Sequence, residues 1–205
     1  ILIFTELLKL DRLRGDAERK RALDIVDKET RRLIRLVENV LSFARSPSPP
    51  PLHLEAVPLA PLLRDTIDAF RPLADARQAS VEVEVGDGIS GRAERSALRH
   101  VVANLLDNAV KYGPAGQTVR IDATRRNGLL ELGVEDQGPG IPADARERIW
   151  QGFARLEREA NVAGSGIGLS VVRSLVDRMH GKAWVTDGST GGPRLGIALR
   201  AAEDA

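Results

Sequence analysis

The chain has 205 residues, and its 42% hydrophobic content is enough for a core in one or two small domains. Its 30 basic and 29 acidic residues nearly cancel, so charge gives no indication of a nucleic-acid partner. The absence of cysteine excludes disulfides and thiolate metal sites and favours a reducing compartment, which we expect to be the cytoplasm.

Residues 1–10 have the pattern of the end of a helix. The longest apolar run, residues 1–4, is far too short to span a bilayer, so we expect no direct membrane contact by this chain. The sequence starts inside a helical pattern and without methionine. We therefore expect it to be a piece of a longer protein, and a membrane anchor elsewhere in that protein is compatible with this reading.

Residues 16–45 have the pattern of one long helix, which follows a turn at residues 11–15. Apolar residues recur at alternating spacings of three and four, and only Thr30 interrupts this seam. The seam consists of Leu23, Val26, Thr30, Leu33, Val37, Val40 and Ala44. A hairpin with such a seam needs a partner, so we predict a homodimeric four-helix bundle through residues 1–45. The alternative is a helical arm that packs on the rest of its own chain.

Residues 46–51 end this helix. The segment reads Ser-Pro-Ser-Pro-Pro-Pro, and proline lacks the amide donor and disfavours helix in the residue before it. We predict a semi-rigid linker here, which divides the chain into a hairpin (1–45), the linker (46–51) and a second domain (52–205).

The second domain alternates between strand and helix patterns. Strands are predicted at 52–57, 80–85, 118–124, 129–136, 183–186 and 195–199. Helices are predicted at 59–77, 95–112 and 167–180. Asn127-Gly128 is a strong signal for a hairpin turn between two of the strands, and Gly181 is expected to end the last helix. The pattern predicts an α/β domain.

The predicted helix at 95–112 carries polar residues on one face. These residues are Asn104, Asn108, Lys111 and Tyr112. The first three are spaced by four and three residues and Tyr112 follows Lys111, so all four lie on one side of the helix, next to an apolar face. Two amides, an ammonium and a phenol beside a buried stripe indicate the wall of a pocket. Amide oxygens are hard ligands suited to Mg²⁺, which also binds nucleotide phosphates. The alternative is an ordinary solvated helix face.

Asp136 follows the predicted strand at 129–136 and continues its apolar side. A carboxylate at the end of an apolar face is unfavourable unless a donor binds it, and the amino group of adenine is a suitable donor. Gly138 and Gly140 would let the backbone approach the base, and Pro139 and Pro142 would stiffen the turn. The alternative is an ordinary aspartate in a turn that ends a strand.

Residues 164–168, Gly-Ser-Gly-Ile-Gly, lead into the last predicted helix. Glycines before a helix N-terminus leave amides available for phosphate oxygens. No strand leads directly into this loop, and the polar stretch 155–163 precedes it, which fits a Rossmann turn poorly and a flexible lid well. The sequence contains no Walker motif with Gly-Lys-Ser/Thr.

Taken in order, these stretches resemble the N, G1, F and G2 boxes of the GHKL ATP-binding fold, in the version carried by sensor histidine kinases. The boxes correspond to residues 104–112, 136–140, 153 and 164–169. The resemblance implies an α+β chain in which a helical hairpin, forming a dimeric four-helix bundle, precedes a GHKL (Bergerat) two-layer α/β sandwich. Its mixed sheet would carry helices on one face.

The resemblance also implies roles for the N and G1 boxes. Asn108 would hold Mg²⁺, and Asn104 would support the metal or its bound water. Lys111 would reach the phosphates of ATP, and Tyr112 would line the nucleotide. Asp136 would select adenine.

The remaining boxes would complete the ATP site. Gly138 and Gly140 would bound the base pocket. Phe153 would anchor the lid, and Arg155 would contact the terminal phosphate. The glycine box would close over the phosphates, and it consists of Gly164, Ser165, Gly166, Gly168 and Leu169. Serine stands at position 165 where threonine is common, which is a mild departure.

The implied function is that of an ATP-dependent protein-histidine kinase core in two-component signalling. Such a core phosphorylates a histidine on its hairpin and passes the phosphoryl group to an aspartate of a response-regulator receiver domain. Matching residues 5–8 to the first hairpin helix places that histidine upstream of Ile1. His53, His100 and His180 all lie outside residues 1–45, and His180 is expected to act as a helix cap or end charge. We therefore expect this chain to bind Mg-ATP without carrying the acceptor.

Three alternatives remain open. A degenerate kinase would act as a dimeric, nucleotide-sensing scaffold for a regulator. GHKL ATPases of the topoisomerase, mismatch-repair or heat-shock chaperone kind normally have a glutamate at the Asn104 position to activate water, and asparagine cannot act as that base. An anti-sigma serine kinase is disfavoured by the long heptad hairpin.

Overall fold

The structure is a computed structural model, and it describes residues 15, 18–23, 25–26, 51–86, 88–154 and 166–202. The chain divides into two units, Ile1–Arg45 and Ser46–Ala205. In the first unit, residues 18–23 and 25–26 are helical. The rest of the predicted hairpin, most of its seam, the dimeric bundle and linker residues 46–50 lie outside the described residues. None of the helices in these ranges is long and apolar enough to cross a bilayer.

The described part of the second unit alternates strands and helices. The strands are β1 (Glu55–Pro58), β2 (Ser80–Val85), β3 (Ser90–Ala93), β4 (Thr118–Arg126), β5 (Leu129–Glu135), β6 (Lys182–Asp187) and β7 (Pro193–Arg200). The helices are α3 (Leu59–Asp75), α4 (Arg95–Tyr112) and α5 (Gly168–Arg178), with 3-10 helices η1 (Ala143–Ala145) and η2 (Arg148–Trp150) between β5 and α5.

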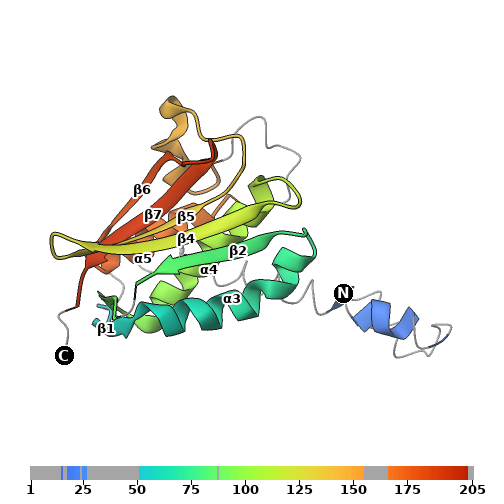
Figure 1. The fold of residues 1–205 in the computed structure, drawn as a ribbon, viewed down its shortest axis with the longest axis horizontal. Helices are drawn as coiled ribbons and strands as arrows, with labels where there is room; N and C mark the ends of the chain where they lie inside the picture. The colour runs from blue at the N-terminus through green and yellow to red at the C-terminus, as the bar shows by residue number, and fades with distance from the viewer. Residues whose placement is uncertain are drawn as a thin grey trace. The chain divides into compact units, whose positions relative to one another are not determined.

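Five of the strands form one mixed sheet in the order β2-β4-β5-β7-β6 (Figure 1). β2 and β4 are parallel, and the other neighbours are antiparallel. β1 and β3 form a separate antiparallel pair. β3 was not predicted because its sequence, Ser-Gly-Arg-Ala, lacks the β-branched and aromatic residues typical of strands. The predicted strand at 52–57 is shifted, since β1 begins only at Glu55.

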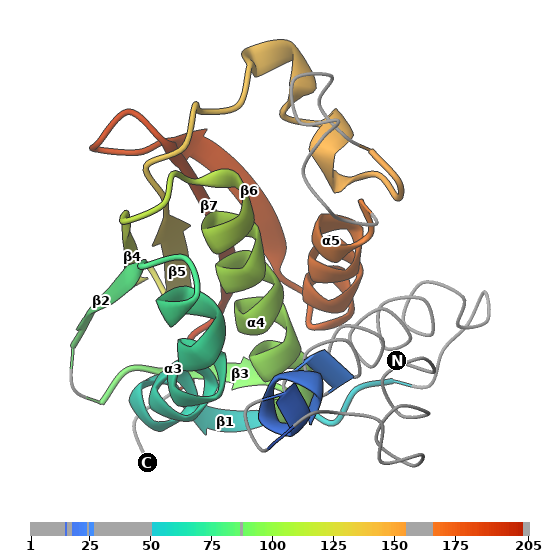
Figure 2. The ribbon, with the colours of Figure 1, turned by 90° about the vertical axis from the view of Figure 1, so that its right-hand side faces the viewer.

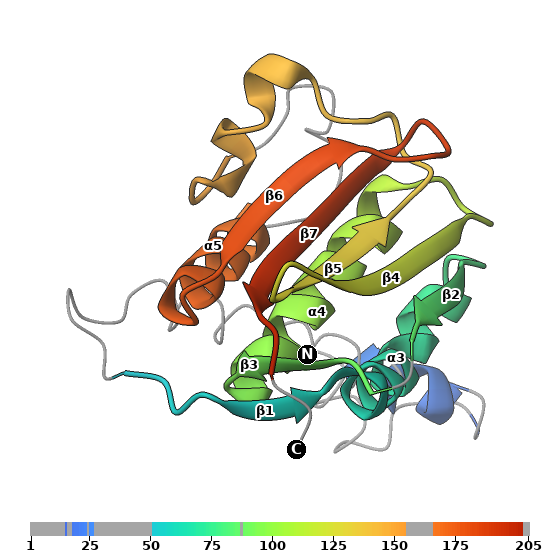
Figure 3. The same cartoon turned by 60° about the vertical axis from the view of Figure 1, so that its left-hand side comes forward.

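The domain has two layers, which confirms the predicted α/β sandwich with a mixed sheet. α3, α4 and α5 lie side by side against one face of the sheet, with α4 in the middle (Figure 2). In the described part of the unit, no helix covers the opposite face (Figure 3). The core lies between the layers, where alternate residues of the three central strands are buried: Val119, Ile121, Ala123, Leu130, Leu132, Val134, Leu195, Ile197 and Leu199.

α4 has the predicted bounds, and both its ends have clear physical causes. At its start, the Glu94 carboxylate accepts hydrogen bonds from the amides of Ser96 (3.0 Å) and Ala97 (2.8 Å). The last intrahelical bond is donated by the Gly113 amide to the Ala109 carbonyl (3.0 Å). Pro114 follows Gly113, and a residue before proline is disfavoured in the helical region.

Residues with positive φ occur at a hairpin turn and at the end of α5. Asn127 and Gly128 both have positive φ (51° and 75°), as the predicted tight hairpin turn requires. At the end of α5, however, the left-handed residue is His180 (φ 58°), and the helix ends at Arg178 rather than at the predicted residue 180. Gly181 is needed for close packing instead, because a Cβ there would overlap the carbonyl oxygen of Ala198.

We predict that Glu94→Ala lowers the free energy of unfolding by about 1 kcal/mol at pH 7, because two amides at the start of α4 lose their acceptor. Burial raises the pKa of Glu94, but the hydrogen bonds from Ser96 and Ala97 outweigh this and hold the pKa below its usual range. The contribution is therefore complete above about pH 5 and is lost as the pH falls through the lowered pKa.

Chemical denaturation between pH 3 and pH 7 measures this difference. Glu55→Ala, on the exposed edge of β1, serves as the control and should change stability by less than about 0.5 kcal/mol. A Glu94→Ala penalty that does not shrink in acid would show that the carboxylate does not act as a charged cap.

Candidate functional site

Three segments that are far apart in the sequence meet at one end of the helical layer. They are the C-terminal half of α4, the loop after β5 and the N-terminus of α5. α5 packs directly on α4, and α4 contacts β5 (Figure 2). The N-box, G1-box and part of the G2-box residues predicted from the sequence therefore lie on neighbouring elements.

The Asp136 carboxylate is buried at the end of β5. The residue is only 2% exposed and follows the buried Leu132 and Val134 in the alternation of the strand. Its Oδ1 accepts a hydrogen bond from the Gly138 amide at 2.7 Å. A Cβ at Gly138 would lie 2.6 Å from that oxygen and 3.2 Å from the carbonyl oxygen of Tyr112, so the loop packs against the end of α4 only because residue 138 is glycine.

Asn104 faces the first residue of α5. Its Nδ2 donates to the carbonyl oxygen of His100, one turn earlier, at 2.9 Å. That bond orients the amide so that its Oδ1 would lie 3.0 Å from a Cβ added to Gly168. The fit between α4 and α5 at this point is therefore close, and Gly168 leaves room for the Asn104 oxygen.

The other polar residues of α4 continue the same stripe. Asn108, Lys111 and Tyr112 are all partly buried. The Lys111 ammonium forms an ion pair with the Asp107 carboxylate, one turn earlier on the helix. This pairing was not predicted from the sequence. It holds the ammonium at the C-terminal end of α4, near the polar stripe.

Phe153 and Gly166 stand on either side of residues 155–165. The Phe153 amide donates to the Gly166 carbonyl oxygen at 2.9 Å, so the two ends of that segment are joined. Both residues have positive φ (66° and 69°), and the Phe153 side chain is 65% exposed. Leu169 is half-buried and packs on the core. The predicted site residues Arg155, Gly164 and Ser165 lie outside the described residues.

Gln117 links two parts of the site, and sequence reasoning did not identify it. Its buried side chain donates from Nε2 to the carbonyl oxygen of Ala109 on α4 (2.8 Å) and accepts at Oε1 from the amide of Gln137 (3.0 Å). Gly113 lies so close that a Cβ there would overlap the Gln117 amide. One side chain therefore joins the helix that carries Asn108 to the loop that follows Asp136.

The assembled groups have a defined chemical character. A buried carboxylate can accept hydrogen bonds from an amino group, and amide oxygens are hard ligands. The N-terminus of α5 supplies backbone amides and the positive end of a helix dipole, which favour anions. No group of three or more histidine, aspartate or glutamate residues suited to hold a metal occurs in the described ranges.

Comparison with known proteins identifies the family. Residues 93–203 match the family described as histidine kinase-, DNA gyrase B-, and HSP90-like ATPase. The chain belongs to this family, and its second unit therefore contains an ATP-binding domain of the predicted GHKL type.

Similar proteins include a sensory kinase and a sensor protein. The chain is 34% identical to the adaptive-response sensory kinase SasA of Synechococcus sp. (strain JA-3-3Ab), over 77% of this chain and 42% of that protein. It is 31% identical to the alginate biosynthesis sensor protein KinB of Pseudomonas aeruginosa, over 83% of this chain and 29% of that protein. The chain thus spans less than half the length of these two relatives.

Solved structures of sensor histidine kinases have the same fold. The mycobacterial sensor histidine kinase MprB superposes with a TM-score of 0.64 at 28% identity, over 73% of this chain and 98% of MprB. Full-length ShkA, crystallised with AMPPNP, superposes with a TM-score of 0.75 at 27% identity, over 96% of this chain and 42% of ShkA. The predicted resemblance to the catalytic core of sensor histidine kinases is confirmed.

We predict that Gln117→Ala destabilises the domain by about 2–3 kcal/mol, because the Ala109 carbonyl and the Gln137 amide lose their buried partner. Urea denaturation measures the effect. Gln151→Ala, at an exposed position, is the matched control and should cost less than about 0.5 kcal/mol. Equal effects of the two substitutions would contradict a stabilising role for the Gln117 bridge.

Proposed function

We propose that this chain is the catalytic core of an ATP-dependent protein-histidine kinase in a two-component signalling system. In this proposal residues 52–205 bind Mg-ATP, residues 1–45 form the dimerisation hairpin, and residues 46–51 are the hinge between them. The observation that carries the proposal is the buried Asp136 carboxylate beside the glycine loop and the polar stripe of α4. The names of the similar proteins, which are sensor kinases, support it.

Asp136 is proposed to select adenine. A carboxylate this deeply buried needs hydrogen-bond donors, and the adenine amino group would add one to the Gly138 amide already present. Gly138 and Gly140 would let the base approach the backbone, and Tyr112 would line the nucleotide. ShkA was crystallised with AMPPNP, which makes an adenine nucleotide the natural first ligand to test on this chain.

Asn108, with Asn104, is proposed to hold Mg²⁺. Their amide oxygens suit this ion, which keeps several waters and shares its coordination with phosphate oxygens. The Asn104 Nδ2 already donates to His100, which directs its oxygen toward the start of α5. When bound, the metal would neutralise phosphate charge and orient the terminal phosphate.

The phosphates are proposed to lie near the N-terminus of α5. Gly166, Gly168 and Leu169 would supply the helix start, and Lys111 would reach the phosphates from α4. Phe153 would anchor a lid formed by residues 155–165, and the hydrogen bond from the Phe153 amide to the Gly166 carbonyl oxygen supports this role. Further lid residues proposed to contact the phosphates are Arg155, Gly164 and Ser165.

In this arrangement the protein would act mainly by positioning and charge neutralisation. A histidine on a helical bundle would attack the terminal phosphorus in line, the bond from that phosphorus to the bridging oxygen would break, and ADP would leave. The phosphoryl group would then pass from the histidine nitrogen to an aspartate of a receiver domain, which frees the histidine. Hydrolysis is a poorer fit because Asn104 cannot act as a base toward water. We propose a homodimer, a response regulator as partner, and a cytoplasmic location for this core.

We predict that Asp136→Asn weakens ATP binding about 10- to 100-fold, because a hydrogen bond to a charged acceptor at the base is lost. Isothermal titration calorimetry on the full 205-residue chain measures the affinity. Asp75→Asn, at the exposed end of α3, is the control and should bind ATP normally. Unchanged ATP affinity in Asp136→Asn would refute the proposed base contact.

We predict that the chain binds Mg-ATP but gains no acid-labile phosphate when incubated with γ-labelled ATP, because none of its three histidines lies in the hairpin. Nucleotide retention measured with and without EDTA tests the metal requirement. Acid-labile, base-stable label on the chain would place the acceptor among those histidines. Sustained ATP hydrolysis would instead favour the ATPase alternative.

A further inference from the structure

Glu135, the residue before Asp136, is a buried carboxylate that the proposed reaction does not use. It ends β5 and is only 7% exposed. Because successive residues of a strand face opposite sides, Glu135 lies on the side of the sheet away from the helices, whereas Asp136 continues the helix-facing side. A buried carboxylate on that side needs an explanation of its own.

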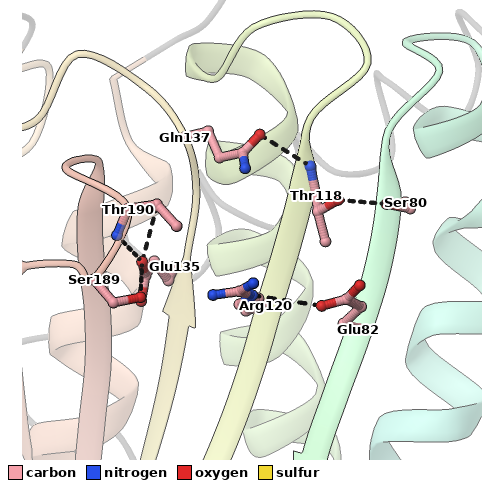
Figure 4. A network of polar contacts seen from close by, with 8 residues as sticks. All are labelled: Ser80, Glu82, Thr118, Arg120, Glu135, Gln137, Ser189 and Thr190. Carbon is pink, nitrogen blue, oxygen red and sulfur yellow. Dashed lines mark hydrogen bonds and ion pairs between the residues drawn. The ribbon is translucent and has the colours of Figure 1, made fainter.

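The turn between β6 and β7 provides the hydrogen-bond donors. Oε1 of Glu135 accepts from the Ser189 hydroxyl (2.9 Å), the Thr190 amide (2.9 Å) and the Thr190 hydroxyl (3.0 Å) (Figure 4). Burial raises the pKa of Glu135, but the hydrogen bonds from Thr190 and Ser189 outweigh it and hold the pKa below its usual range. Glu135 is therefore charged at neutral pH.

The two arginines next to Glu135 in the sheet pair with other carboxylates. Arg120 and Arg194 are the cross-strand neighbours of Glu135 on β4 and β7. However, Arg120 pairs with Glu82 at 3.4 Å (Figure 4), and Arg194 donates from Nε to Asp122 at 3.0 Å. Among the described contacts, the Glu135 carboxylate is thus held by the turn rather than by either neighbouring cation.

The same turn packs directly on the backbone of Asp136. The Gly188 amide donates to the Gly192 carbonyl oxygen (2.7 Å) and closes the turn, and the Asp136 amide donates to the Pro193 carbonyl oxygen (3.2 Å). A Cβ at Gly192 would overlap the Asp136 carbonyl and lie 3.0 Å from the Gly138 amide nitrogen. At Gly188, a Cβ would lie 2.6 Å from the carboxyl carbon of Glu135.

We propose that Glu135 is a positioning residue for the nucleotide site. By binding Ser189 and Thr190, it holds the turn 188–192 against the peptide of Asp136. This contact fixes the position of the Asp136 carboxylate, which is proposed to bind the adenine base. This inference rests on the proposed role of Asp136. It adds a specificity determinant on the far side of the sheet, outside the four sequence boxes.

The test compares ATP and GTP affinities of variants of the full chain by calorimetry. We expect Glu135→Ala to weaken ATP binding about 10-fold while GTP binding changes little, because a misplaced Asp136 loses the contact that distinguishes adenine from guanine. Glu135→Gln keeps an acceptor oxygen and should restore affinity to within about threefold of the wild type. Glu131→Ala, on the same side of β5, is the matched control and should bind ATP as the wild type does.

A double-mutant cycle with Asp136→Asn separates the two proposals. If Glu135 acts through Asp136, Glu135→Ala should have little further effect on ATP affinity in the Asp136→Asn background. Additive losses, or unchanged nucleotide discrimination in Glu135→Ala, would overturn the positioning role alone. No effect of Asp136→Asn by itself would instead overturn the proposed base contact.

A milder variant keeps the test valid if Glu135→Ala does not fold. The double substitution Ser189→Ala, Thr190→Val removes both hydroxyl donors at exposed positions and leaves the carboxylate in place. It should reduce the preference for ATP over GTP in the same direction as Glu135→Ala. Wild-type discrimination in this folded variant would overturn the inference.

Discussion

The apolar stripe of α4 is buried completely against the five-stranded sheet, and this packing sets the position of the rest of the site. Leu98, Val101 and Leu105 are each 0% exposed, so the helix cannot rotate without exposing them to water. Asn104 and Asn108 lie on the adjoining stripe and are therefore held at the boundary between core and solvent. Hydrophobic burial thus fixes the helix face on which these amides lie, and the hydrogen bond from Asn104 to the His100 carbonyl oxygen then orients the Asn104 side chain.

Close backbone approach completes the site around that helix. Gly138 brings the loop after β5 against the end of α4, Gly168 admits the Asn104 oxygen, and Gly192 places the β6–β7 turn on the Asp136 peptide. A Cβ at Gly192 would overlap the Asp136 backbone, one at Gly138 would overlap the Asp136 carboxylate, and one at Gly168 would press on the Asn104 side chain. Protein interiors tolerate such displacements poorly because they are close-packed, so the three glycines act together to keep α4, β5 and α5 in one arrangement.

Two adjacent carboxylates, Glu135 and Asp136, face opposite sides of the sheet at the end of β5. Asp136 continues the apolar, helix-facing side of the strand, where it is proposed to bind the base. Glu135 faces the opposite side and is already satisfied by Ser189 and Thr190. The pleat of the strand keeps the two carboxyl groups on opposite sides of the sheet. Under the two proposals, consecutive residues of the sheet would carry the base-binding group and its structural support.

Local patterns in the sequence determined the helix at residues 95–112, the strand at 80–85 and the hairpin turn at Asn127-Gly128, because periodicity and turn chemistry depend only on near neighbours in the chain. The order of the boxes also determined the family. Tertiary structure alone decided the hydrogen-bond partners of Gln117 and Glu135 and the left-handed conformation of His180. Gln117 and Glu135 bind partners 8 to 55 residues away, and nothing in the local sequence specifies which buried group a long-range contact will satisfy.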